Sequence, residues 1–182
     1  MKTNFKTDKF NEIQTPFYYY DLDVLRNALD VIKKESDNSG YEVHYAVKAN
    51  HNPRILEIIS SYGFGADCVS GNEVTAALNA GFRPSGIVFA GVGKTDREIE
   101  TALDADIFCF NCESIPELEV INQLAARHNK TARIALRINP YIDAHTHNHI
   151  TTGIEESKFG INTWEIEEAM KRISTMNNIK ML

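Results

Sequence analysis

Lys48 is the residue of this sequence whose position most strongly suggests chemistry. It ends the run VHYAVK, whose apolar residues are typical of a buried β-strand. The alternation of a strand would place Lys48 on the same face as Ala46 and opposite Val47. An amine that is enclosed and partly desolvated loses its proton more readily and becomes a nucleophile. We therefore expect Lys48 to form a Schiff base with a carbonyl cofactor or substrate.

Two further charged residues stand at the ends of apolar runs. Asp67 ends the segment GAD, and Arg137 lies near the end of RIALRIN, where alternation predicts that Leu136 and Ile138 face the opposite side. The carboxyl ends of parallel strands meet at one edge of a sheet or barrel. Lys48, Asp67 and Arg137 are therefore expected to converge on one mouth. The alternative is a structural ion cluster at the strand ends.

The segment HTHNH places His145, His147 and His149 at alternate positions. On an extended segment these side chains would share a face, as metal ligands can. No carboxylate or cysteine is clearly placed to complete a site, although Asp143 is near. We therefore predict a polar loop here and no metal site.

Cys109 and Cys112 form a C-x-x-C pair in FCFNCES. A zinc site would need a second pair of ligands, and a redox pair would need a thioredoxin-like context. Neither is visible, so we interpret the pair as two packed thiols. Three cysteines, an odd number without a disulfide framework, fit a reducing cytosol.

The segment AGVGKT suggests a nucleotide-binding loop. That loop requires G-x-x-x-x-G-K-[ST], and the first position here is Val88 instead of glycine. The motif is therefore excluded, and Lys94 is expected on the rim of the mouth.

Six short apolar runs alternate with helical segments along the chain. The runs are YEVHYAV, GADCVS, GIVFA, IFCF, ARIALRI and IKML. Capping residues and capping-box spacings mark the helix starts. The predicted N-caps are Asp21, Asn52, Ser70, Thr95, Ser114 and Asn162. Strands that alternate with helices indicate βαβ units and a parallel sheet.

Two α/β architectures fit this alternation, an open doubly wound sheet and a closed (β/α)8 TIM barrel. A dinucleotide-binding sheet should show G-x-G-x-x-G after its first strand, but KANHNP follows Val47. The barrel is therefore predicted, with about six of its eight strands present. A barrel of this kind takes about 250 residues, so we expect 182 residues to be an incomplete one.

Composition places the chain among ordinary globular proteins and excludes several classes. Apolar residues make up 43% and charged residues 24%. The net charge of −6 argues against nucleic-acid binding, because no basic patch is available to neutralise phosphates. No apolar run approaches the roughly 18–20 residues of a membrane span, and no apolar signal core directs export. A cytoplasmic protein is expected.

The segment YAVKAN, with the apolar spacing that follows it, resembles the cofactor-attachment signature of the barrel-type, alanine-racemase-like pyridoxal-phosphate-dependent amino-acid decarboxylases. GFGADCVSGNEV and FAGVGKTDREI resemble the next two strand segments of that family. LRINPYIDAHTHNHITTGIEESKFGI resembles the diaminopimelate decarboxylases within it. The resemblance runs from about Thr15 to Leu182.

The resemblance implies a cofactor, pyridoxal 5'-phosphate, held covalently by Lys48 as the catalytic residue. It also implies that Ala46, Asp67, Arg137 and His147 line the cofactor site. The implied activity is decarboxylation of meso-2,6-diaminopimelate to lysine in lysine biosynthesis. A small amino acid is then the substrate, and a homodimer is expected for the full-length protein.

The family pattern also implies a domain division. Residues 1–20 would be an N-terminal extension with a short strand, and residues 21–182 the truncated barrel, without the C-terminal β-domain. We expect this polypeptide alone to have little or no activity. Asn72 stands where the diaminopimelate enzymes usually have glycine. The alternatives are an ornithine, arginine or carboxynorspermidine decarboxylase of the same fold, or a non-catalytic carrier of the cofactor.

Overall fold

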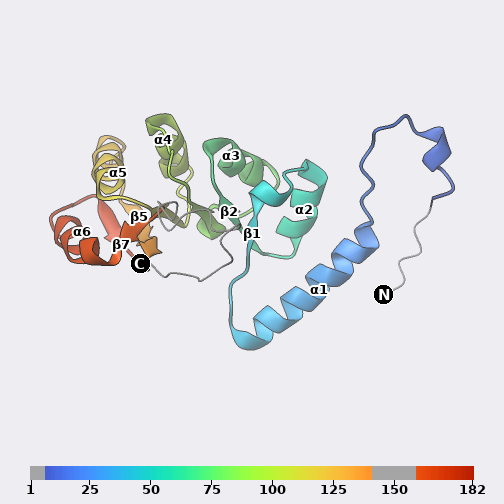
Figure 1. The fold of residues 1–182 in the computed structure, drawn as a ribbon, viewed down its shortest axis with the longest axis horizontal. Helices are drawn as coiled ribbons and strands as arrows, with labels where there is room; N and C mark the ends of the chain where they lie inside the picture. The colour runs from blue at the N-terminus through green and yellow to red at the C-terminus, as the bar shows by residue number, and fades with distance from the viewer. Residues whose placement is uncertain (1–6, 141–158) are drawn as a thin grey trace, which may run out of the picture. The chain divides into compact units, whose positions relative to one another are not determined.

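The structure is a computed structural model that describes residues 7–140 and 159–182. The chain divides into two compact units, Met1–Val43 and His44–Leu182 (Figure 1). None of the helices in the described ranges is both long and apolar enough to cross a membrane.

In residues 7–43, the first unit contains one 3-10 turn, η1 (Phe10–Glu12), and one long helix, α1 (Leu22–Ser39). The predicted N-cap of α1 is confirmed, since the Asp21 carboxylate accepts hydrogen bonds from two backbone N–H groups of the first turn. The helix ends at Gly40, whose φ of 68° lies in the left-handed region that favours glycine.

The second unit is built on a parallel sheet whose strands follow one another in chain order. Each neighbouring pair is parallel, and the order is β1-β2-β3-β4-β5-β8. A doubly wound sheet would reverse its order at a switch point. The predicted α/β barrel arrangement, with six strands, is therefore confirmed. The strands are β1 (His44–Ala46), β2 (Gly65–Cys68), β3 (Ile87–Phe89), β4 (Cys109–Cys112), β5 (Ala132–Leu136) and β8 (Ile179–Met181).

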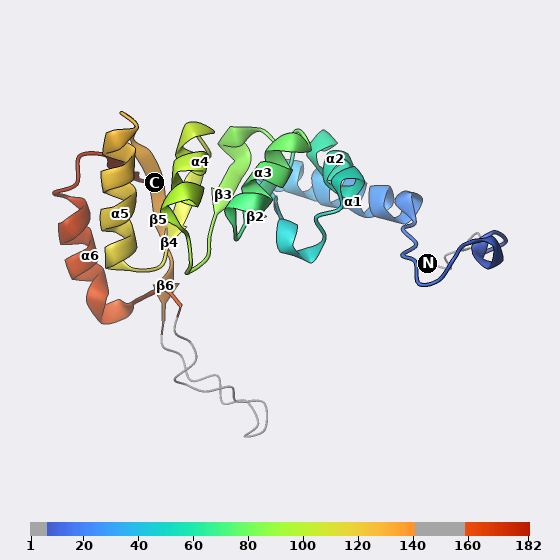
Figure 2. The ribbon, with the colours of Figure 1, turned by 90° about the horizontal axis from the view of Figure 1, so that it is seen from above.

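A helix lies between successive strands, and Figure 2 shows the helices in a row along the sheet. The helices are α2 (Pro53–Ser61), α3 (Gly71–Asn79), α4 (Asp96–Asp104), α5 (Ile115–Arg127) and α6 (Ile166–Ile173), with 3-10 turns η2 (Val47–Ala49), η3 (Pro84–Gly86) and η4 (Thr163–Glu165). The side chains of Asn52, Ser70 and Ser114 cap the first turns of their helices as predicted. At Asn162 the cap opens η4 first, and α6 follows it.

The hydrophobic core of the second unit comes from both its strands and its helices. In β2 the alternation is regular, since Ala66 and Cys68 are fully buried while Asp67 is partly exposed. The ring centroids of Phe89 and Phe110, on neighbouring strands, lie 6.1 Å apart. The largest fully buried side chains are Phe89, Phe110, Leu56, Ile59, Ile87, Ile99, Leu118, Ile121, Leu124, Ile134, Val47 and Val74.

A second, two-stranded sheet was not predicted. β6 (Ile138–Asn139) pairs in parallel with β7 (Ile161–Asn162), and the Ile161 N–H donates to the carbonyl oxygen of Arg137 at 2.8 Å. Here the predicted orientation of Ile138 is wrong, because Ile138 is exposed and Asn139 is buried. The chain leaves the main sheet after Leu136, so the alternation of β5 does not continue past its end.

Candidate functional site

Lys48 lies just beyond the end of its strand. β1 stops at Ala46, and Lys48 is the middle residue of the 3-10 turn η2. A hydrogen bond from the Tyr45 hydroxyl to the carbonyl oxygen of Asn50, 3.1 Å long, holds this turn against the strand. The Lys48 side chain is exposed, in contrast to the fully buried Val47 before it. Both residues lie in a 3-10 turn and not in a strand, so the strand alternation predicted for them is wrong, and the enclosure expected of the Lys48 amine is not observed.

A cleft of about 660 Å³ opens at the carboxyl ends of β1 to β5. Three residues predicted to converge, Lys48, Asp67 and Arg137, line this one cleft. Ala46 is not a lining residue, although the strand register pairs it with Asp67. His147 lies outside the described residues. The full lining is Lys48, Asp67, Val69, Ala90, Gly91, Val92, Asn111, Glu113, Leu136, Arg137 and Phe159.

Glu113 is a charged residue of this cleft that the sequence did not single out. Its side chain is only 3% exposed, and it directly follows β4. One oxygen, Oε1, accepts the backbone N–H of Gly91 at 3.0 Å, and both oxygens accept Arg137 Nη1 at 3.2 Å. Its place after a strand is the same signal that singled out Lys48 and Asp67.

Arg137 is held from the other side by the segment that leads into β7. The Phe159 ring centroid lies 5.6 Å from the guanidinium carbon, which is within the range of a cation–π contact. Gly160 allows its own backbone to lie close to the backbone of Arg137. Its φ is +94°, and a Cβ there would lie 2.8 Å from the Arg137 carbonyl oxygen. The second sheet therefore fixes the backbone on which Arg137 stands.

Glutamates at the third position of α4 and α5 accept backbone N–H groups at the starts of these helices. Glu98 of α4 accepts the backbone N–H groups of Thr95, at 2.9 Å, and of Gly71, at 2.8 Å. The pKa of Glu98 lies below its usual value mainly because of the hydrogen bond from the Thr95 N–H and, second, the one from the Gly71 N–H. Glu117 of α5 accepts the backbone N–H of Glu113 at 2.7 Å. Glu98 therefore connects the start of α3 with the start of α4, whereas Glu117 caps the start of its own helix.

Lys94 does not lie on the rim, as the sequence suggested, but is buried. Its side chain is 1% exposed. The ammonium group donates to the carbonyl oxygens of Gly91 and Asn111 and to the carboxylate of Glu117, at 2.7, 2.9 and 2.6 Å. Three acceptors use all three of its donors. Lys94 is therefore a structural cation, which agrees with the exclusion of a nucleotide-binding loop.

The cysteines are packed thiols, as predicted. Cys68, Cys109 and Cys112 are all free and buried. Burial raises the pKa of Cys68 to about 12, with a further contribution from the nearby carboxylates of Glu73 and Asp67. Burial likewise raises the pKa of Cys109 and Cys112. Because the thiolate is the reactive form, none of the three is poised as a nucleophile.

A metal site receives no support among residues 7–140 and 159–182. No group of three potential ligands from His, Cys, Asp and Glu gathers there, and His145, His147 and His149 fall outside those ranges.

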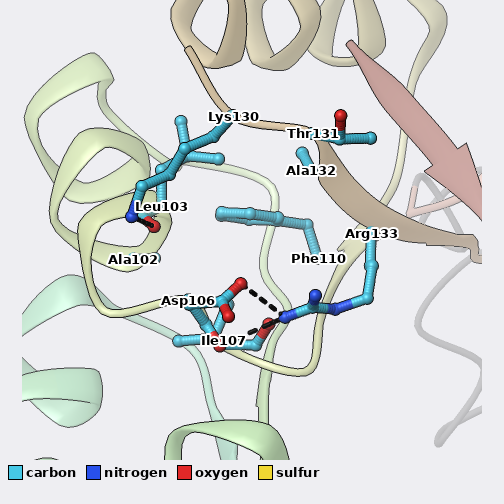
Figure 3. A pocket seen from close by; sticks show the side chains of 9 residues that line it. All are labelled: Ala102, Leu103, Asp106, Ile107, Phe110, Lys130, Thr131, Ala132 and Arg133. Atoms are coloured by element: carbon cyan, nitrogen blue, oxygen red, sulfur yellow. Dashed lines mark hydrogen bonds and ion pairs between the residues drawn. The ribbon is translucent and has the colours of Figure 1, made fainter. Parts of the chain in front are cut away.

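A second pocket, at the amino ends of β4 and β5, is shown in Figure 3. Its volume of about 10 Å³ is room for a single water molecule. Arg133 closes it by donating to the Asp106 carboxylate at 2.8 Å.

The model of the family described as "Pyridoxal-dependent decarboxylase, pyridoxal binding domain" matches residues 22–182. The chain belongs to this family of pyridoxal-dependent decarboxylases. The predicted resemblance to the pyridoxal-phosphate-dependent decarboxylases is therefore confirmed, and the matched residues include the whole cleft.

Named relatives in the decarboxylase family agree with this assignment. The chain is 56% identical over 183 residues to diaminopimelate decarboxylase of Bacteroides thetaiotaomicron, covering 100% of this chain and 47% of that protein. The crystal structure of Helicobacter pylori diaminopimelate decarboxylase complexed with L-lysine is similar with a TM-score of 0.85 at 40% identity, over 96% of this chain and 44% of that one. A structure of the enzyme from M. jannaschii gives a TM-score of 0.82 at 33% identity, over 97% and 43% of the two chains. The chain thus spans about half the length of the curated relatives it matches.

Proposed function

We propose that this chain is the cofactor-binding part of a diaminopimelate decarboxylase, which converts meso-2,6-diaminopimelate to lysine and carbon dioxide in lysine biosynthesis. The observation that carries the proposal is the convergence of Lys48, Asp67 and Arg137 on one cleft in a chain of this family. The 56% identity to the Bacteroides enzyme supports this substrate over others.

The residues of the cleft fit pyridoxal 5'-phosphate. A volume of about 660 Å³ lies within the range of roughly 300–1,000 Å³ that ligand sites occupy. Lys48 offers the primary amine that an aldehyde requires, on a 3-10 turn fixed by Tyr45. When bound, this cofactor supplies an electron sink for the pair left by a departing carboxylate.

The chain's own residues then have separate tasks. Lys48 would hold the cofactor covalently through Nζ, and Asp67 and Arg137 would place one negative and one positive charge in the same cleft. Fixed charges in a walled site interact more strongly than in water. Ala46 and His147 complete the proposed cofactor-binding set.

Diaminopimelate is a better candidate substrate than ornithine, arginine or carboxynorspermidine. Relatives from Bacteroides, Aquifex and Helicobacter, at 56%, 40% and 45% identity, are named diaminopimelate decarboxylases. The likeness to a Chlorella virus arginine decarboxylase is at 23% identity and shows the fold alone. A homodimer in the cytoplasm is proposed on the same resemblance, and the dimer can be tested by light scattering of the purified protein.

The direct test is release of carbon dioxide by the protein produced from its complete reading frame, supplied with pyridoxal 5'-phosphate. We expect turnover with meso-diaminopimelate that exceeds turnover with ornithine or arginine, and loss of turnover in Lys48→Ala. Preference for ornithine or arginine would overturn the substrate assignment. Cofactor binding without any turnover would favour the non-catalytic carrier. Residues 1–182 alone are expected to show little or no turnover, since the chain covers 47% of the Bacteroides enzyme.

A further inference from the structure

We propose that Glu113 is a positioning residue for Arg137, and that it holds the guanidinium in the cofactor cleft. The inference rests on the proposed function of that cleft. Arg137 Nη1 lies 3.2 Å from each oxygen of the Glu113 carboxylate. The same carboxylate accepts the Gly91 N–H at 3.0 Å. One side chain after β4 therefore connects the loop after β3 with the end of β5.

The two partners differ in their exposure, and this sets the direction of the effect. The Glu113 side chain is 3% exposed, whereas that of Arg137 is 50% exposed. The carboxylate is thus the buried anchor, and the guanidinium is the end that reaches the cleft. A buried carboxylate is stable only when charged or polar partners compensate its lost hydration. Among the described residues these partners include Gly91 and Arg137.

Holding Arg137 matters because an arginine side chain has many rotamers. A ligand that needs its charge would otherwise restrict those rotamers at the moment of binding, which weakens affinity. The Glu113 ion pair and the Phe159 ring contact the guanidinium from different elements, so that it is restricted before any ligand arrives. Because the Glu113 side chain is only 3% exposed, its main effect on the ligand is expected through Arg137.

A purely structural role for Glu113 gives a different expectation. In that case the carboxylate only clamps the loop at Gly91, and an amide would replace it adequately, since its oxygen still accepts one N–H. Glu113→Gln keeps this acceptor but removes the charge from the pair with Arg137. It therefore separates the two roles.

The experiment measures pyridoxal 5'-phosphate binding by absorbance titration of the cofactor-free protein from its complete reading frame. The variants are Glu113→Gln, Arg137→Met and the double variant. We expect each single variant to raise the dissociation constant about tenfold or more, the scale of one charge-assisted hydrogen bond. The double variant should bind no worse than Arg137→Met alone, because the two residues act as a unit. Dissociation constants unchanged within about twofold in Glu113→Gln, or effects that multiply, would overturn the proposal.

Controls separate this inference from folding and from the proposed function. Glu119→Gln changes an exposed carboxylate on α5 and should leave the dissociation constant unchanged. If Glu113→Gln does not fold, Glu113→Asp keeps the charge and shortens its reach, and it should show a smaller rise of the same sign; no rise would count against the role. Reduction with borohydride at saturating cofactor should label Lys48 in every variant. Absence of that label in the unchanged protein would refute the proposed function itself, whatever the Glu113 variants show.

Discussion

The Lys94 ammonium and the Glu117 carboxylate form a buried ion pair, 2.6 Å long, between the loop before α4 and the first turn of α5. The side chains are 1% and 14% exposed. The same ammonium also donates to the carbonyl oxygens of Gly91 and Asn111. Lys94 therefore fastens the loop before α4 to β4 and to the first turn of α5.

Lys94→Met should lower the free energy of unfolding by about 3–5 kcal/mol, the usual cost of breaking a buried pair on one side. It leaves the Glu117 carboxylate and two carbonyl groups without their donor. Urea unfolding measures the change. Lys33→Met is the matched control, because the Lys33–Asp37 pair is exposed and should be worth less than about 0.5 kcal/mol. Equal effects of the two substitutions would contradict the structural role of Lys94.

Glu98 should make stability depend on pH in the acid range. Its pKa is lowered by the N–H groups of Thr95 and Gly71, so the folded state holds its proton less tightly than the unfolded state. The stabilisation is then present above the unfolded pKa of about 4.3 and is lost as pH falls through the folded value. Glu98→Gln should destabilise by about 1 kcal/mol at pH 7.

This difference should shrink as the pH is lowered below about 4. Chemical unfolding of both proteins across the acid range provides the measurement. Glu57→Gln is the control, since Glu57 is exposed on α2. A Glu98→Gln deficit of constant size at every pH would show that the charge of Glu98 contributes nothing.

Gly65→Ala should destabilise the protein by roughly 1–3 kcal/mol, in the range of overpacking. A Cβ at this position would lie 2.5 Å from the carbonyl oxygen of Gly86 and 2.5 Å from His44 Nδ1. Gly93→Ala is a close control, because nothing lies within 4 Å of a Cβ there. Thermal unfolding of both variants tests the difference. If Gly65→Ala were as stable as Gly93→Ala, this would contradict the close contact of Gly65 with Gly86 and His44.

The three cysteines should react slowly with thiol reagents in the folded protein. Burial raises the pKa of each thiol, that of Cys68 to about 12, so little thiolate is present near neutral pH. Peptide mapping after brief alkylation near neutral pH should find these residues unlabelled, and labelled after denaturation. Rapid native labelling of Cys109 or Cys112 would revive the redox interpretation of the pair.

The main sheet could be predicted because its strands are apolar runs separated by marked helix starts. All six runs became strands of one sheet, and the caps at Asp21, Asn52, Ser70 and Ser114 formed. β6 and β7 could not be predicted. Each has only two residues, and their pairing depends on Gly160, which approaches Arg137 closely in space but is distant in sequence.

The cleft was predicted in part, for a similar reason. Alternation within β2 located Asp67, but Lys48 and Arg137 lie beyond the ends of β1 and β5 and were located by their place at the strand ends. Leu136, which was predicted to face away from Arg137, lines the same cleft. Glu113 was missed because a glutamate between a strand and a helix cap is also typical of an exposed loop, and its partners are distant in sequence. Lys94 was misplaced because its acceptors come from the loop after β3, from β4 and from α5, and no local pattern reveals such a set of contacts.

The most direct measurement of the central proposal is borohydride reduction of the protein with pyridoxal 5'-phosphate, followed by tryptic peptide mapping. A lysine carrying the reduced cofactor resists trypsin. The expected product is therefore the uncleaved peptide 35–54, in which Lys48 is the only lysine. Adduct on that peptide, and its loss in Lys48→Arg, is the predicted result. Adduct confined to other lysines, or none at saturating cofactor, would contradict the role of Lys48.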